Sequence, residues 1–119
     1  MTDRPHPKRG EVWWVKPGKT AGAELQKKRP YVVISADSMG SLPVKIAVPL
    51  RSWQDRFKDV VWLVPIAATR ANGLKRDVAA DVLQVKSFDT NKFEDRQGRL
   101  SAAEMDDITA ALAIVVEYE

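Results

Sequence analysis

The stretches Arg29-Pro-Tyr-Val-Val-Ile-Ser35 and Leu42-Pro-Val-Lys-Ile-Ala-Val-Pro-Leu50 decide the fold class of this chain. Both are short, rich in β-branched and aromatic residues, and bounded by turn-forming residues, which is typical of β-strands. Pro30 is tolerated near the start of the first run because a proline there removes no central ladder bond. The pattern therefore predicts two successive strands with a connection over Ala36–Ser41 and a bend at Pro49.

Three further runs extend this β pattern in both directions. Glu11–Val15 (EVWWV) lies upstream, and Asp59–Ile66 (DVVWLVPI) and Ala79–Ser87 (AADVLQVKS) lie downstream. Asn72-Gly73 is a turn signal between the last two runs. The chain is therefore expected to hold at least five short strands.

The spacing of apolar residues changes near the C-terminus. Ser101 and Glu104 have the spacing of a capping box. An apolar stripe follows at spacings of three and four, typical of an amphipathic helix: Met105, Ile108, Leu112 and Val115. Asp89–Asp95 is expected to form a shorter helix. Strands followed by a terminal helix predict a mainly β (α+β) fold, in which a small, strongly bent sheet or barrel packs against the helix.

The length of 119 residues fits one domain, expected over residues 10–119. Residues 1–9 are polar, basic and proline-rich, and we expect a disordered tail there without the apolar centre of a signal peptide. No apolar run approaches the roughly 20 residues that a membrane-spanning helix needs. The chain has no cysteine, which excludes a disulfide framework and fits a reducing cytoplasm.

The net charge of +3 is unevenly distributed. Residues 1–30 contain eight basic and three acidic residues, whereas residues 101–119 contain five acidic and no basic residues. A polyanionic partner that touches part of the surface fits this asymmetry, and so does a solvated surface without a binding role.

Few catalytic chemistries are open to these residues. His6 is the single histidine and lies in the expected tail, so a two-histidine ribonuclease mechanism and a histidine metal site are both disfavoured. Gly18 and Gly22 match neither the Walker pattern nor the dinucleotide-binding pattern. Asp106 and Asp107 are adjacent and face different directions on a helix. We therefore expect no metal and no cofactor.

Basic residues interleaved with aromatic residues favour single-stranded nucleic acid, whose bases stack on aromatic rings while cations hold the phosphates. Two such clusters occur: Lys27-Lys28-Arg29, and Arg51-Ser52-Trp53 with Arg56-Phe57. Trp13, Trp14 and Trp62 are expected in the core because aromatic strand residues usually pack. Trp53 lies in a polar loop, where RNA contact and packing both remain open.

Several short motifs occur in a characteristic order along the chain: Arg9-Gly-Glu-Val-Trp-Trp-Val15, Gly22-x-Glu24, Arg29-Pro30, Val48-Pro-Leu50, Asn72-Gly-Leu74, Gln84 and Gly98-Arg-Leu-Ser101. Each motif alone is weak, but their order and spacing resemble the MazF/PemK (Kid) family of toxin endoribonucleases. The resemblance extends from about Arg9 to the C-terminus.

This resemblance implies an SH3-like barrel of the CcdB/PemK type, with five to seven short strands, and a homodimer. It also implies a cytoplasmic toxin that cleaves single-stranded RNA sequence-specifically and is blocked by a cognate antitoxin. The implied reaction needs no metal. The ribose 2′-hydroxyl attacks the neighbouring phosphorus and leaves a 2′,3′-cyclic phosphate and a 5′-hydroxyl.

The resemblance also implies site residues. Arg29 matches the catalytic arginine of the family's Arg-Pro motif, where a guanidinium can stabilise charge on the phosphoryl oxygens; a surface arginine at a strand start is the alternative. The family's catalytic threonine is replaced by Arg51, and Ser52 keeps the following hydroxyl. Arg51 either adds a second cation at the phosphate or marks weakened catalysis.

The remaining matches concern RNA contacts and proton transfer. Glu24 is a candidate general base, with ordering of its loop as the alternative. The Kid branch uses a histidine, an arginine and an aspartate at positions that here hold Ala23, Asp81 and Leu83, so that acid–base arrangement is missing. Gln84 matches a family glutamine that could bond a base or the RNA backbone. The other RNA-binding candidates are Lys27, Lys28, Trp53 and Arg56.

Two other functions stay open at this point. One is a module of the same fold that binds RNA or an antitoxin with weakened catalysis, which the threonine replacement by Arg51 favours. The other is a protein-targeting toxin, since the related CcdB fold acts on DNA gyrase. The Arg29-Pro30 motif and the basic clusters favour RNA.

Overall fold

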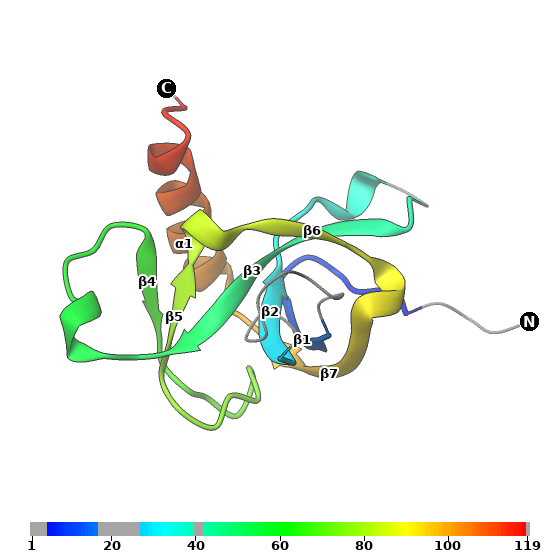
Figure 1. The fold of residues 1–119 in the computed structure, drawn as a ribbon, viewed down its shortest axis with the longest axis horizontal. Coiled ribbons are helices and arrows are strands. Elements are labelled where there is room, and N and C mark those ends of the chain that lie inside the picture. Colours follow the sequence, from blue (N-terminus) through cyan, green and yellow to red (C-terminus); the bar gives the residue numbers. More distant parts are fainter. Residues whose placement is uncertain (1–4, 17–26, 40–41, 119) are drawn as a thin grey trace, which may run out of the picture.

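One long strand, β3, connects the two parts of the sheet of this protein (Figure 1). The computed structural model describes residues 5–16, 27–39 and 42–118. These residues form seven antiparallel strands and one C-terminal helix, which confirms the predicted mainly β class. The elements are β1 (Glu11–Val15), β2 (Arg29–Val33), β3 (Val44–Ser52), β4 (Leu63–Ile66), β5 (Val78–Asp81), β6 (Lys86–Asp89), β7 (Phe93–Arg99) and α1 (Ala102–Val115).

The strand order is β4-β5-β3-β2-β1-β7, and β6 pairs with the first part of β3. On one side, β3 pairs with β6 over Val44–Ala47 and then with β5 over Leu50–Ser52. Pro49 lies between these two ladders, where its missing N–H removes no ladder bond. The expected strand Leu42–Leu50 therefore continues through its proline and ends at Ser52.

Two hydrophobic cores lie on the two faces of the sheet, because successive strand residues point in opposite directions. One core joins the sheet to α1 and includes Val12, Val32 and Ile108. The other includes Val33 and Phe93 and is enclosed where β6 and β7 curl over the opposite face (Figure 1). This curvature brings the starts of β2 and β6 close to the end of β5.

Helix α1 begins and packs as the sequence predicts. The Ser101 side chain accepts a hydrogen bond from the Glu104 N–H at 3.1 Å, and the Glu104 carboxylate accepts one from the Ser101 N–H at 2.8 Å. Such a cap stabilises a helix by about 1 kcal/mol. The predicted apolar stripe faces the first core, with Met105 and Ile108 buried. No helix in the described ranges is long and apolar enough to cross a membrane.

The expected single strand Ala79–Ser87 is wrong. A 3₁₀ turn over Val82–Gln84 divides it into β5 and β6, which pair with different parts of β3. Val82 is buried in the turn, whereas Leu83 is half exposed. The apolar run suits either a strand or a tight turn, and only the pairing with β3 decides between them.

The expected helix over Asp89–Asp95 is also wrong. Thr90–Lys92 forms a 3₁₀ turn, and β7 begins at Phe93. The sequence of β7, FEDRQGR, has no apolar alternation because the strand lies at an edge of the sheet. Charged residues are common on edge strands, where they discourage pairing with other chains.

The expected strand Asp59–Ile66 is shorter than predicted. Asp59 adopts a left-handed backbone conformation (φ 66°), and the strand begins only at Leu63. Trp62 therefore lies in a turn with 38% of its surface exposed. Its expected place in the core is wrong, and Trp13 and Trp14 are only partly buried.

Residues 1–9 were expected to form a disordered tail, but residues 7–9 contact the rest of the domain. Pro7 is fully buried, and the Lys8 N–H donates to Glu11 Oε1 at 2.8 Å. The Arg9 N–H donates to Asp37 Oδ1 at 2.8 Å, and its guanidinium donates to the Ile34 carbonyl. These contacts attach residues 7–9 to the domain, while residues 1–4 lie outside the described ranges.

Candidate functional site

A polar groove of about 400 Å³ lies where the starts of β2 and β6 meet the end of β3 and the turn after β5. Its lining residues are Arg29, Tyr31, Pro49, Arg51, Asp81, Gln84 and Lys86. Alternation along the strands places Arg29 and Tyr31 of β2 on the same face as Pro49 and Arg51 of β3. The structure therefore brings together the two arginines and the glutamine that the sequence singled out.

The arginines differ in how they are held. Arg51 Nη1 lies 3.1 Å from Asp81 Oδ2, and the guanidinium lies 5.1 Å from the centre of the Phe57 ring. Arg29 is partly buried, and in the described part of the chain it forms no ion pair of this kind. Arg51 is thus fixed by two contacts, whereas the Arg29 guanidinium has no ion-pair partner among the described residues.

Asp81 is the least exposed polar group of the groove. Its side chain is 5% exposed, against 37% for Arg51. Asp81 Oδ1 is buried and has no hydrogen-bond partner among the described residues. A buried carboxylate is costly unless it is paired, so Asp81 depends on Arg51 for its charge balance.

Tyr31 and Lys86 complete the groove. Burial raises the pKa of the Tyr31 phenol, and the positive charge of Arg29 opposes that rise in part. The phenol therefore stays neutral at physiological pH. Lys86 Nζ lies 5.9 Å from the Phe88 ring centre and adds a third cation. Sequence reasoning named neither residue for the site, and only the β-pairing reveals them.

Ser52 lies on the opposite face of β3 from Arg51. It lines a separate cavity together with Trp14 and Pro30, so the expected cooperation of Ser52 with Arg51 is not found. The cause is the two-residue period of a strand, which sends neighbouring side chains to opposite faces.

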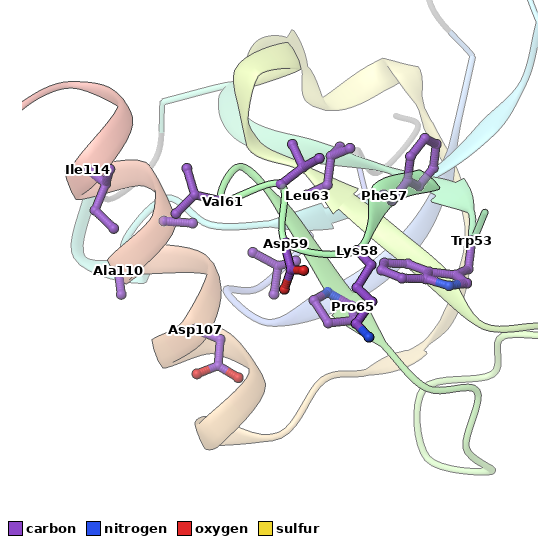
Figure 2. A pocket seen from close by; sticks show the side chains of 13 residues that line it. Trp53, Phe57, Lys58, Asp59, Val61, Leu63, Pro65, Asp107, Ala110 and Ile114 are labelled. Atoms are coloured by element: carbon purple, nitrogen blue, oxygen red, sulfur yellow. The ribbon is translucent and has the colours of Figure 1, made fainter. Parts of the chain in front are cut away.

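Trp53 points into a third cavity, between the β3–β4 connection and α1 (Figure 2). Its ring makes an edge-to-face contact with Phe57, with centroids 5.8 Å apart. The guanidinium of Arg56 lies 5.3 Å from the same Phe57 ring, and Arg56 Nε donates to Gln54 at 2.8 Å. Phe57 thus contacts Trp53, Arg56 and Arg51, but neither Trp53 nor Arg56 lines the groove.

The lysines before β2 differ in their contacts. Lys27 is exposed. Lys28 Nζ lies 2.8 Å from Glu94 Oε1 and 3.8 Å from Asp95 Oδ2, and the bond to Glu94 raises the pKa of Lys28. Glu24 lies outside the described residues. Within the described ranges, no group of three or more histidine, cysteine, aspartate or glutamate side chains is placed to hold a metal ion.

Comparison with known proteins places the chain in a family. A family model described as the PemK-like, MazF-like toxin of type II toxin–antitoxin systems matches residues 8–116. The chain belongs to this family. Its members include endoribonuclease MazF9 of Mycobacterium tuberculosis (strain ATCC 25618 / H37Rv), which is 31% identical over 113 residues, covering 90% of this chain and 93% of that protein.

Solved structures agree with this PemK/MazF-like assignment at the level of the fold. MazF from Deinococcus radiodurans superposes with a TM-score of 0.73 at 20% identity, covering 93% of this chain and 96% of that one. An endoribonuclease from a mycobacterial species, solved with its cognate antitoxin, superposes with a TM-score of 0.71 at 18% identity, covering 96% and 98%.

Proposed function

We propose that this PemK/MazF-like protein is an endoribonuclease that cleaves single-stranded RNA at specific sequences. The observation that carries the proposal is the groove that gathers Arg29, Arg51 and Lys86, in which Arg29 forms no ion pair with any described residue. Three cations at one concave site suit a phosphodiester. The relative named endoribonuclease MazF9 supports the same activity.

In the proposed reaction, the ribose 2′-oxygen attacks the adjacent phosphorus after losing its proton to a base. The P–O5′ bond then breaks, and the leaving 5′-oxygen takes up a proton. The products are a 2′,3′-cyclic phosphate and a 5′-hydroxyl, and no metal takes part. Negative charge builds on the phosphoryl oxygens, where the Arg29 guanidinium stabilises it as a preorganised donor.

Arg51 supplies the second cation. Its contacts with Asp81 and Phe57 engage one edge and one face of the guanidinium, which leaves other N–H groups for a phosphoryl oxygen. Gln84 lies at the same groove and can bond a base or the RNA backbone. Glu24 stays the proposed general base. Ser52 is no longer assigned to this step because of its position on the opposite face.

Further RNA contacts are proposed outside the groove. Lys27 and Lys28 lie immediately before Arg29 on the chain, where they can contact flanking phosphates. Arg56 and Trp53 both contact Phe57, which also contacts Arg51, so a longer RNA that leaves the groove at Arg51 can reach them. Lys28 must share its charge with Glu94, so its contribution is the weakest of the four.

A cognate antitoxin and a second copy of the chain are the proposed protein partners. The antitoxin would act by covering the groove, in the cytoplasm. Exposed apolar side chains support a homodimer, because such surface on a small domain usually marks an interface. They include Val61 and Ile114, which line one cavity beside α1 (Figure 2). Light scattering at micromolar concentration should give twice the mass of 13.3 kDa; a monomer would contradict the dimer.

The decisive experiment is incubation of the purified protein with a long RNA in EDTA, followed by mapping of the 5′ and 3′ ends. We expect discrete cuts with 5′-hydroxyl and cyclic phosphate ends, which disappear in Arg29→Ala. Arg70→Ala is the matched control because Arg70 is exposed and lies outside the groove. Cuts that require added Mg²⁺, or that persist in Arg29→Ala, would overturn the proposed mechanism.

A second candidate is a binding module with weakened catalysis, which the Arg51–Asp81 ion pair favours because it engages the cation that replaces the family threonine. Intact RNA together with measurable RNA or antitoxin binding would support this candidate. Growth arrest with intact RNA and broken DNA would instead indicate a gyrase-targeting toxin.

A further inference from the structure

A second cavity, of about 430 Å³, lies on the opposite face of the strand ends that form the groove. Trp14, Ser52, Lys75, Arg76 and Gln97 contribute its polar and aromatic lining. Its volume falls within the range of roughly 300–1,000 Å³ that small-molecule sites occupy. None of the ionic contacts described above for the groove involves this cavity.

The turn that closes this cavity is held by a buried side chain. Asn72 is fully buried, and its Oδ1 accepts hydrogen bonds from the N–H groups of Thr69 and Leu74, both at 3.0 Å. Its Nδ2 donates to the Ala67 carbonyl at 2.9 Å. One side chain thus binds backbone groups on both sides of the turn and makes it rigid.

Two glycines press the same turn against β7. Gly73 has a φ of +70°, and a Cβ atom on it would lie 2.1 Å from the Gln97 carbonyl oxygen. A Cβ atom on Gly98 would lie 2.3 Å from the Ala71 carbonyl oxygen. Only glycine allows these two backbones to approach so closely. The cavity is therefore preformed, with rigid walls on the strand side and on the turn side.

The lining suits one nucleotide. The indole of Trp14 lines the cavity, with Lys28 Nζ 6.0 Å from the centre of its ring. The Ser52 hydroxyl and the Gln97 amide can each donate and accept hydrogen bonds. Lys75 and Arg76 are exposed at the rim, and none of the described residues that line the cavity is acidic. An aromatic surface, an amide and cations together are the groups that proteins use to bind an unpaired base and its phosphate.

The cavity and the groove open on two sides of the same strand ends. Pro30 lines the cavity and follows Arg29, and Ser52 lines it and follows Arg51. Consecutive strand residues are about 3.3 Å apart along the strand. An RNA strand whose scissile phosphate lies at Arg29 can therefore turn over this edge and place a neighbouring base in the cavity.

We propose that the cavity between Trp14, Ser52 and Gln97 binds one unpaired base of the RNA next to the cleaved phosphate and sets the sequence preference at that position. Lys75 and Arg76 hold the phosphate of the same nucleotide. This subsite rests on the proposed ribonuclease activity. It separates the two tasks of the enzyme, because the groove stabilises charge and the cavity selects the base.

The test compares cut-site profiles on a pool of RNAs with all sequences. In Gln97→Leu, the preference at one position beside the cut should fall about tenfold, since a base contact is worth roughly 1–3 kcal/mol. Gln97→Glu keeps the size of the side chain but only accepts hydrogen bonds, so the preference should change to another base. Ser52→Ala removes the hydroxyl from the cavity and should also weaken the preference at that position. Ser38→Ala is its control, because Ser38 is exposed in the turn before β3.

A second measurement does not depend on cleavage. Titration of the wild-type protein with each of the four nucleoside 5′-monophosphates should shift the indole N–H resonance of Trp14, assigned with Trp14→Phe, and leave that of Trp62 unchanged, because Trp62 lines neither the cavity nor the groove. Equal shifts of both indoles, or of neither, would overturn the subsite.

The two proposals fail in distinguishable ways. A wild-type protein that leaves RNA intact but binds a nucleotide at Trp14 contradicts the ribonuclease and supports the cavity as a base site. Unchanged cut-site profiles in Gln97→Leu and Gln97→Glu, with cleavage intact, overturn the cavity alone. Variants that keep their profiles but lose antitoxin binding would assign the cavity to the antitoxin and overturn its assignment to RNA.

Discussion

The groove and the cavity lie on opposite faces of the same strands and have opposite character. The groove holds Arg29, Arg51 and a buried carboxylate, whereas the cavity has a largely apolar wall closed by a hydrogen-bonded turn. Neighbouring residues of one strand, such as Arg51 and Ser52, therefore line different sites, the groove and the cavity. Strand alternation lets a small sheet carry a charged groove on one face and a more apolar cavity on the other.

The largest expected effect concerns charge in the groove. Arg29→Ala should lower kcat/KM by about 100- to 1,000-fold, because it removes a donor to the phosphoryl oxygens. Arg76→Ala at the rim of the cavity should change kcat/KM less than about tenfold, mainly through KM. Initial rates on an RNA with one mapped site would measure both. Equal losses of kcat/KM in Arg29→Ala and Arg76→Ala would contradict the assignment of different tasks to the groove and the cavity.

The next effect concerns the wall of the cavity. Asn72→Ala removes three side-chain hydrogen bonds of a fully buried residue. At about 1 kcal/mol for each bond, the free energy of unfolding should fall by about 3 kcal/mol. Urea denaturation would measure this fall. Asn91→Ala, at an exposed turn, should change the free energy of unfolding by less than about 0.5 kcal/mol. If Asn91→Ala destabilises the protein as much as Asn72→Ala does, the hydrogen bonds of Asn72 are not what holds the turn.

A smaller effect concerns the ion pair of the groove. Arg51→Thr leaves Asp81 buried without its partner, and the free energy of unfolding should fall by about 2 kcal/mol. This value lies below the usual cost of breaking a buried pair because Arg51 is 37% exposed. The variant Arg51→Thr with Asp81→Ala should regain part of the stability in urea denaturation.

The single variant Arg51→Thr and the double variant with Asp81→Ala also test whether Arg51 contributes to catalysis. Both should cleave RNA about tenfold more slowly than wild type if Arg51 contacts the phosphate, since a charged hydrogen bond contributes roughly 1.5–3 kcal/mol. Faster cleavage by Arg51→Thr, which restores the family's threonine, would instead show that Arg51 weakens catalysis. If the double variant cleaves RNA at the same rate as the wild type, Arg51 has only a structural role.

The smallest expected effect is on the pH dependence of stability and concerns Glu11, which lines neither the groove nor the cavity. Burial tends to raise the pKa of Glu11, but hydrogen bonds from the Lys8 N–H, Trp13 and Arg96 outweigh it and lower the pKa below 4.5. A lowered pKa in the folded state stabilises the protein above the unfolded value, and that stability is lost as the pH falls through the folded pKa.

Thermal unfolding should therefore show a decline below about pH 4.5 that is shallower in Glu11→Gln. The pKa of Glu94 is lowered as well, by its bond to Lys28, so Glu94→Gln is the matched control for the same pH window. Because Glu94 is exposed, its contribution should be smaller. A steeper decline in Glu11→Gln than in wild type would contradict the assigned contacts.

Sequence reasoning predicted local elements well where the pattern was strong. The bounds of β1 and the Ser101–Glu104 capping box match the structure because short-range periodicity and local hydrogen bonds determine them. It failed at β7, where an edge strand carries polar residues, and at the 82–84 turn, where partner choice along β3 interrupts the strand.

The candidate site was predicted only in part for a similar reason. Arg29, Arg51 and Gln84 were found from motifs, and they meet in one groove. Asp81 and Lys86 were not found, since their roles depend on pairing across strands that are distant in the sequence. Ser52 was named from the family motif and Trp53 from its place in a polar loop among basic residues, and neither basis tells which surface the side chain faces.

The sequence by itself determined the mainly β class, the terminal helix with its cap, and the family to which the chain belongs. Periodicity, capping and motif order are properties of neighbouring residues, so they need no folded structure. Only the tertiary structure decided that Arg51 is bound to Asp81, that Ser52 faces away from it, and that a clamped turn closes a second cavity. These outcomes depend on strand register and on contacts between segments that are distant in the sequence. A register shift of one residue would move every side chain of a strand to the opposite face of the sheet.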